Sequence, residues 1–295
     1  MAQHDEDLGS DFDPPAAAVR DAVRRALSED IGPLGDLTAA LVPAALVATG
    51  AFTARQPGVL AGRTCATEAC AAVDPAIELT WVRTDGDRLA AGDVVATVRA
   101  PLRTLLTAER TALNFLCHLS GVASATRRLV DAVAADNPHT QVWDTRKTTP
   151  GLRALEKAAV RAGGGANHRG SLSDMVLVKD NHLAGVSITE AVHAARRRWP
   201  ARTVEVECDR LEQVEEAAAA GATLVLCDNM SPEQVAAAVG SVAGRALIEV
   251  SGGITLATAP AYAAAGADLL STSSITQSAP ALDLGLDLDP VQPAT

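Results

Sequence analysis

DTRKTTPGLRALEKAAVRAGGGANHRGSLSDMVLVKDNH, residues 144–182, joins a helical segment, a glycine run and a short apolar strand in immediate succession. Charged side chains follow the apolar segments. Arg146 and Lys147 come just after a predicted strand at Gln141–Trp143, and Lys179 comes just after another at Met175–Val178. Short strands that alternate with helices are typical of a βα repeat. The stretch therefore predicts parallel strands with charged groups at their carboxyl ends.

The same pattern continues through the following hundred or so residues. Four more apolar segments predict strands at Val204–Val206, Thr223–Cys227, Ala246–Val250 and Asp268–Leu270. The polar groups that follow these strands are Glu207, Asp228, Ser251-Gly252-Gly253 and Ser271–Ser274. In a parallel βα barrel the carboxyl ends of the strands meet on one face, where active sites are built. Each group alone fits the polar start of a loop equally well, but six in succession favour one shared pocket.

The length of this repeat argues against a complete eightfold barrel. About 135 residues separate the first strand from the last, whereas a TIM barrel takes roughly 200 or more. We therefore predict an α/β fold built on a reduced or open, TIM-like βα barrel of about six strands. Capping signals predict helices between the strands, namely Thr149-Pro150 with Gly163 as terminator, Ser187 with Glu190, and Ser231-Pro232.

The first part of the chain predicts a separate layer of helices and short strands. Helical spacing predicts a helix from Pro14 to near Ser28, and amphipathic spacing predicts others at Thr104–Leu119 and, after Gly121, at Val122–Ala135. We predict three parts: an acidic disordered tail at 1–13, an N-terminal α+β sandwich domain at 14–118 that residues 276–295 join, and a βα-barrel catalytic domain at 119–275.

Charge is distributed unevenly along the chain. The sequence carries a net charge of −11 with a pI near 5.0. Residues 139–182 hold seven Lys/Arg against four Asp/Glu, a net +3 that leaves −14 for the remainder. A basic island in an acidic protein focuses an anionic small molecule and argues against general nucleic-acid binding.

Composition also restricts the compartment. No apolar run approaches the roughly 18 residues of a membrane span, and the acidic start does not resemble a secretory signal. The five cysteines contain no C-x-x-C pair, which disfavours both a disulfide framework and a thiolate zinc site. We therefore expect a cytoplasmic protein with no membrane partner.

The side chains at the strand ends indicate a multiply anionic ligand. The guanidinium groups of Arg146 and Arg169 suit bidentate contacts with carboxylates, whereas the ammonium groups of Lys147 and Lys179 suit phosphate or pyrophosphate. The turn Ser251–Gly253 precedes a helix predicted near Thr255, so its N–H groups and the helix dipole suit a further phosphate.

Carboxylates and imidazoles add a second kind of chemistry to the same face. Glu207 and Asp228 suit sugar hydroxyls, Mg²⁺ or a cationic transition state. His168 and His182 have no H-x₃-H or cysteine partner, which favours hydrogen bonding over metal binding. Arg110 and its neighbour Glu109, taken by themselves, fit an ion pair on a solvated helix face.

Several motifs resemble a known enzyme family. The runs DTRKTTPGLR, GGGANHRGSLSDMVLVKDNH, EVECD, LCDNM and EVSGGI, in this order, are similar to those of quinolinate phosphoribosyltransferases. LLTAERTALNFLCHLSGVAS upstream and ITQSAPALDLGLDL downstream extend the resemblance over nearly the whole chain. The resemblance implies a pentosyltransferase of the glycosyltransferase class. It would transfer phosphoribose from 5-phosphoribosyl 1-pyrophosphate (PRPP) to quinolinate and release pyrophosphate and CO₂, giving nicotinate mononucleotide for de novo NAD synthesis.

The resemblance also assigns roles to individual residues. It implies catalytic roles for Lys147, Lys179, Glu207 and Asp228, with Mg²⁺ as cofactor held largely through PRPP and by Glu207 and Asp228. It implies a homodimer, or a higher oligomer, in which Arg110 enters the partner's site. The substrate-binding residues it implies are Arg110, Thr145, Arg146, His168, Arg169, His182, Ser251, Gly252, Gly253 and Ser273.

The sequence departs from the family pattern near its end. STSSITQS stands where the family shows a glycine and a histidine, so that Ser273 replaces the glycine and Gln277 the histidine. We expect altered phosphate contacts there with the same reaction. Two alternatives stay open: a related phosphoribosyltransferase with another pyridine or pyrimidine substrate, and a phosphosugar-binding module without catalysis.

Overall fold

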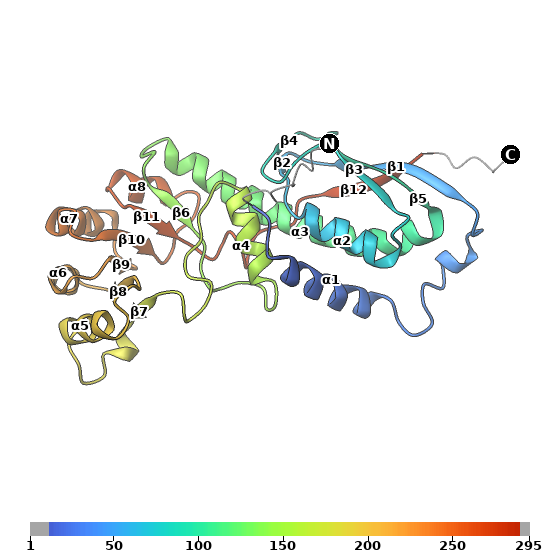
Figure 1. The fold of residues 1–295 in the computed structure, drawn as a ribbon. Coiled ribbons are helices and arrows are strands. Elements are labelled where there is room, and N and C mark those ends of the chain that lie inside the picture. The colour runs from blue at the N-terminus through green and yellow to red at the C-terminus, as the bar shows by residue number, and fades with distance from the viewer. Residues whose placement is uncertain (1–11, 290–295) are drawn as a thin grey trace, which may run out of the picture. The chain divides into compact units, whose positions relative to one another are not determined.

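The computed structural model describes residues 12–289. Residues 1–11 of the predicted acidic tail lie outside the described part. The chain divides into two compact units, of which unit 1 comprises Met1–Ala125, Thr149–Gly164 and Ala279–Thr295, and unit 2 comprises Thr126–Thr148 and Gly165–Ser278. Each unit has its own sheet (Figure 1). No helix in the described range is long and apolar enough to cross a membrane.

Unit 1 is built on a four-stranded antiparallel sheet in the order β12-β1-β5-β3. β12 comes from the C-terminal segment and pairs with β1, so the chain's end completes the N-terminal sheet. Phe52 and Val95 are fully buried in its core. The elements are α1 (Ala16–Asp30), η1 (Ala39–Leu41), β1 (Val47–Ala54), β2 (Gly58–Val59), α2 (Arg63–Val73), β3 (Glu78–Trp81), β4 (Arg88–Leu89), β5 (Val94–Pro101), the first part of α3 (Leu102–Ala134), α4 (Arg153–Ala162) and β12 (Leu284–Leu288).

Helix α3 runs through Gly121, where the sequence predicted a break between two helices. The two helices expected on either side of Gly121 are a single continuous helix, so the predicted break is wrong. Gly121 is needed for a different reason: a Cβ atom there would overlap the carbonyl oxygen of Pro280. Glycine allows the returning chain to approach the helix backbone closely.

Unit 2 confirms the predicted parallel sheet. Its six strands, all parallel, follow the order β6-β11-β10-β9-β8-β7. β6 and β7 stand at the two ends and do not pair with each other within the described residues, as expected for an open barrel. The elements are β6 (Gln141–Trp143), β7 (Val176–Val178), η2 (Asp180–His182), α5 (Ile188–Arg198), β8 (Val204–Cys208), α6 (Leu211–Ala220), β9 (Leu224–Asp228), α7 (Pro232–Val242), β10 (Leu247–Ser251), α8 (Ala259–Ala264) and β11 (Leu269–Ser271).

The helix starts are confirmed where the side chains themselves form the cap. Ser187 and Ser231 each form a capping box with the residue three positions on. The predicted start at Thr149-Pro150 is wrong, because Gly151 has a φ of +80° and α4 begins only at Arg153. Segment 149–164, which was placed in the barrel domain, groups with unit 1 instead.

Candidate functional site

A cavity of about 490 Å³ lies over the carboxyl ends of the strands in unit 2. Charged or polar groups come from the ends of β8, β9 and β10 and from the loops after β6, β7, β9 and β10. Thr145 and Ser251 are among the predicted residues that line it. The complete lining is Thr145, Arg146, Lys147, His168, Arg169, Leu177, Lys179, Glu207, Leu226, Asp228, Asn229, Glu249, Ser251, Gly252 and Ser271. The structure thus brings most of the predicted site residues together.

Two of the predicted catalytic residues form an ion pair in this cavity. The ammonium group of Lys179, after β7, donates a short hydrogen bond to the carboxylate of Glu207, at the end of β8. The side chain of Lys179 is 39% exposed and that of Glu207 is 19% exposed, so both remain open to a ligand. Asp228, at the end of β9, accepts a hydrogen bond of 2.9 Å from the side-chain amide of Asn229.

The two predicted arginines lie close enough to affect each other. Burial lowers the pKa of Arg169, and the charge of Arg146 lowers it further. Two guanidinium groups held together repel one another, and an anion placed between them relieves that repulsion. This geometry suits a ligand that carries more than one negative charge.

The segment that carries Arg169 is anchored by a buried carboxylate. Asp144 is fully buried and accepts hydrogen bonds from the backbone N–H of His168 at 2.9 Å and from the side-chain amide of Asn167 at 2.8 Å. Ala166 also forms a parallel bridge with Trp143. These bonds fix the loop beside the edge strand β6.

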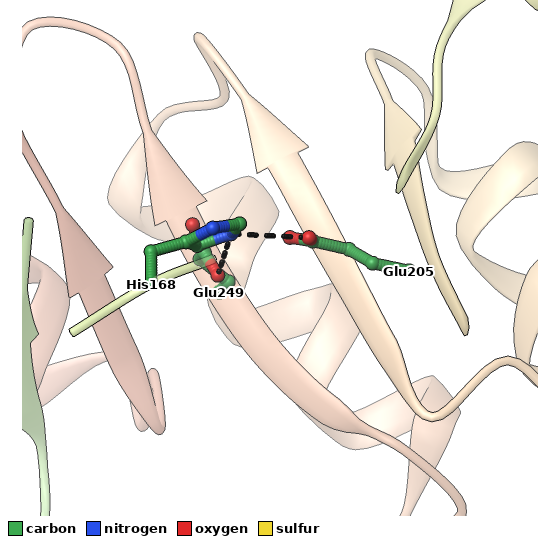
Figure 2. A group of neighbouring side chains, drawn as sticks. All are labelled: His168, Glu205 and Glu249. Carbon is green, nitrogen blue, oxygen red and sulfur yellow. Dashed lines mark hydrogen bonds and ion pairs between the residues drawn. The ribbon is translucent and has the colours of Figure 1, made fainter. Parts of the chain in front are cut away.

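His168 contacts two buried carboxylates, Glu205 and Glu249, which were not predicted from the sequence as site residues. Its Nε2 atom lies 3.1 Å from Oε2 of Glu205 and 3.5 Å from Oε2 of Glu249. Figure 2 draws both contacts as dashed lines. Nδ1 accepts the backbone N–H of Arg169 at 2.8 Å. Trp143 packs edge-to-face on the imidazole at 5.7 Å between centroids. Both ring nitrogens are therefore engaged within the protein.

Burial and charge act in opposite directions within this cluster. Burial lowers the pKa of His168, but hydrogen bonds to Glu205 and Glu249 outweigh it and raise the pKa to about 9. Burial raises the pKa of Glu205 to about 7, and the hydrogen bond from His168 opposes that rise. The only sequence signal for this cluster was a glutamate between two apolar residues in each of two predicted strands, Val204-Glu205-Val206 and Ile248-Glu249-Val250.

The glycine turn after β10 has the expected backbone but lacks the expected helix. Gly252 has a φ of +91°, and a Cβ atom there would overlap the side-chain oxygen of Asn229. The helix predicted near Thr255 begins at Ala259 and has six residues, so the helix-dipole argument for this turn is wrong. Exposed N–H groups remain the means by which the turn can bind a phosphate.

Four predicted site residues do not line the cavity. His182 instead accepts the backbone N–H of Lys179 on Nδ1 at 3.0 Å, and it lines a second cavity of about 630 Å³. Ser273 lies in the turn after β11, where its carbonyl accepts the N–H of Gln277 at 2.9 Å. Gly253 is exposed in the turn after β10, and Arg110 is exposed on α3 in unit 1. Their roles toward substrate stay predictions.

Two family models match most of the described residues. Residues 36–120 match the family described as quinolinate phosphoribosyl transferase, N-terminal domain, and residues 122–287 match its C-terminal domain. The carboxylating nicotinate-nucleotide pyrophosphorylase of Mycobacterium leprae is 45% identical over 281 residues, covering 92% of this chain and 97% of the relative. The Homo sapiens protein of that name is 40% identical, covering 85% of each chain.

Solved structures give the same result. The nicotinate-nucleotide pyrophosphorylase from Francisella tularensis aligns with a TM-score of 0.90 at 37% identity, covering 94% of this chain and 98% of that one. A lower-identity neighbour, human nicotinic acid phosphoribosyltransferase, has a TM-score of 0.58 at 15% identity and therefore shares the fold alone. The chain belongs to the quinolinate phosphoribosyl transferase family.

Proposed function

We propose that this chain transfers the phosphoribosyl group of PRPP to the ring nitrogen of quinolinate, releasing pyrophosphate and CO₂. The product is nicotinate mononucleotide, and the reaction belongs to de novo NAD biosynthesis. Family membership supports the proposal. The observation that carries it is the cavity of unit 2, where four cations, Arg146, Lys147, Arg169 and Lys179, face the two carboxylates Glu207 and Asp228.

Quinolinate accounts for the arginines. It has two adjacent carboxylates, and a guanidinium fork binds a carboxylate through two parallel hydrogen bonds. Arg146 and Arg169, whose charges lie close together, supply one fork for each carboxylate. Nicotinate has a single carboxylate, so a site for nicotinate needs only one such arginine. The paired arginines therefore favour quinolinate over a monocarboxylate.

PRPP accounts for the remaining charged groups. Lys147 and Lys179 neutralise the pyrophosphate as it leaves, and the N–H groups at Ser251–Gly253 hold the 5′-phosphate. Glu207 and Asp228 bind the ribose hydroxyls and stabilise the positive charge that develops at the anomeric carbon. During the reaction, negative charge leaves with the pyrophosphate while positive charge develops at the anomeric carbon. The ion pair places a cation, Lys179, beside a carboxylate, Glu207, so that one group of each sign is available for these two charges.

The carboxylates at the ends of β8 and β9 also suit Mg²⁺. This ion prefers carboxylate oxygens, keeps several waters and is often held largely by substrate phosphates. Glu207 and Asp228, both partly exposed in the cavity, are the residues that would hold it. When bound, Mg²⁺ supplies charge neutralisation to the pyrophosphate.

Decarboxylation follows from the substrate's own electronics. Once the ring nitrogen carries ribose, the ring is a pyridinium cation. Loss of CO₂ from the adjacent carbon leaves an electron pair there, which the cation stabilises until a proton replaces the carboxylate. The protein's part is to hold the ring and its second carboxylate in place, and Arg146 and Arg169 do this.

A second copy of the chain completes the proposed site. Arg110 is exposed on α3 in unit 1, and in the proposed homodimer it enters the partner's cavity and contacts quinolinate. Higher oligomers built from such dimers are compatible with this arrangement. We place the enzyme in the cytoplasm, where the acidic composition and five free cysteines fit.

The test is to incubate the purified chain with PRPP, Mg²⁺ and either quinolinate or nicotinate, and to follow mononucleotide formation. We expect product from quinolinate alone. Product from nicotinate alone, or no product from either substrate, would overturn the proposed function. The Lys179→Ala variant serves as the control for contaminating activity, because loss of the cation beside Glu207 should abolish turnover.

A further inference from the structure

We propose that Glu205 and Glu249 are positioning residues that hold His168 as the neutral tautomer protonated on Nε2, and that through His168 they orient Arg169 in the cavity. This inference rests on the proposed function only for the substrate that Arg169 binds. The arrangement of the three side chains is drawn in Figure 2.

The hydrogen bonds around the imidazole determine its tautomer. Nδ1 lies 2.8 Å from the backbone nitrogen of Arg169, which can only donate, so Nδ1 must accept. In a neutral imidazole one nitrogen accepts and the other donates. Nε2 therefore carries the proton and donates it to Glu205 at 3.1 Å, while Oε2 of Glu249 lies 3.5 Å from the same nitrogen.

Two other states of the ring conflict with this geometry. The two carboxylates favour a second proton on the ring and thereby raise its pKa to about 9, but a doubly protonated imidazolium would place an N–H on Nδ1 directly against the N–H of Arg169. Two donors would then face each other at 2.8 Å. A metal ion on Nε2, which the two carboxylates could help to ligate, would also require the proton on Nδ1. The same short contact excludes both states.

The carboxylates are suited to this role because they are completely enclosed. Glu205 and Glu249 have no exposed surface, and His168 is 7% exposed. Glu205 lies on β8 and Glu249 on β10, and β9 separates these two strands in the sheet. His168 comes from the loop that follows α4. The cluster therefore ties this loop to the middle of the sheet.

The consequence for Arg169 follows from the backbone around it. The N–H of His168 is held by Asp144, that of Arg169 by the imidazole, and that of Gly170 by Asp174 at 2.7 Å. Three consecutive peptide groups are thus fixed, and the Arg169 side chain emerges into the cavity from an anchored backbone. Without the imidazole, the middle anchor is lost.

The tautomer can be measured without substrate. In protein labelled with nitrogen-15 histidine, the imidazole resonances of His168 are identified by their loss in the His168→Gln variant. We expect a proton on Nε2 alone. Protons on both nitrogens would overturn the proposal, and a proton on Nδ1 alone would overturn it in favour of a metal site, to be checked by elemental analysis of the same sample.

The positioning role is tested with a matched pair of double variants. Glu205→Leu with Glu249→Leu removes both carboxyl acceptors but keeps the volume filled. It leaves the buried Nε2–H of His168 without an acceptor, which is destabilising, so urea unfolding of this variant is measured first. Glu205→Gln with Glu249→Gln keeps an amide oxygen for Nε2. We expect the leucine variant to raise the quinolinate KM roughly tenfold, with the PRPP KM little changed, and the glutamine variant to restore most of the affinity.

Other outcomes of the kinetic test overturn the proposal. Equal effects of the leucine and glutamine pairs would mean that the acceptor oxygens are not needed. An equal rise in the KM for both substrates would mean a general structural role. An insoluble leucine variant leaves the tautomer measurement as the deciding one. Turnover of quinolinate by the unmodified chain tests the proposed function separately, so the two failures are distinguishable.

Discussion

Replacing Asp144 by alanine should destabilise unit 2 through two specific hydrogen bonds. The carboxylate is fully buried and accepts from the backbone N–H of His168 and the side-chain amide of Asn167. A buried donor left without an acceptor costs about 1–3 kcal/mol. Asn167 is only half-buried, so its side-chain amide can donate to water in place of the lost Asp144 carboxylate. We therefore expect Asp144→Ala to lower the free energy of unfolding by about 2–4 kcal/mol.

Asparagine at the same position is the matched control. Its amide oxygen can still accept the N–H of His168, and Asn167 can rotate its own amide to face the new NH₂ group. Asp144→Asn should therefore cost less than about 1.5 kcal/mol. Urea unfolding followed by tryptophan fluorescence measures both variants, and Trp143 lies beside the loop in question. Equal losses from alanine and asparagine, or a loss below about 1 kcal/mol for alanine, would contradict the role assigned to the Asp144 carboxylate.

Three further predictions concern the site and the thiols. Arg146→Ala should raise the quinolinate KM by roughly 30-fold or more, which corresponds to a cost of about 2–4 kcal/mol for a desolvated charge pair, and unchanged steady-state kinetics would remove Arg146 from the site. Mixing inactive Arg110→Ala and Lys147→Ala protomers should restore activity if Arg110 acts across subunits, and a verified mixed dimer without activity would contradict this. Burial raises the pKa of Cys208 and of Cys227 to about 12, so at neutral pH few thiolates exist and a thiol reagent should label these residues only after unfolding. Rapid labelling of either in the native chain would contradict it.

The parallel sheet could be predicted because its signals are local. Each strand of unit 2 is a short apolar run that ends at a polar group, and a parallel topology brings these ends together without further information. Lys179 and Glu207 were assigned to one pocket on this ground, and they form an ion pair there. Family resemblance then supplied the substrate, which the spacing of charged residues could not.

The two errors on helix ends have different causes. Gly121 resembled a helix end, but it is required by the approach of Pro280, a neighbour that only the folded chain brings close. Thr149-Pro150 has the composition of a helix start, but Gly151, the next residue, has a positive φ and turns the chain before α4.

Glu205 and Glu249 were missed for a related reason. A strand pattern shows that a glutamate alternates with valines, but it does not show that a loop residue 37 positions away covers it. Without that partner, a carboxylate inside an apolar strand has no evident role. His168 was identified, yet the direction of its ring nitrogens, toward the sheet and the backbone of Arg169, could come only from the structure.

The central claim is that one cavity joins ribosyl transfer to decarboxylation of a dicarboxylate. The most direct measurement uses quinolinate labelled with carbon-13 in the carboxyl group next to the ring nitrogen, together with PRPP and Mg²⁺. Labelled CO₂, pyrophosphate and unlabelled nicotinate mononucleotide should appear in equal amounts. A mononucleotide that retains the label, or pyrophosphate release without CO₂, would contradict it.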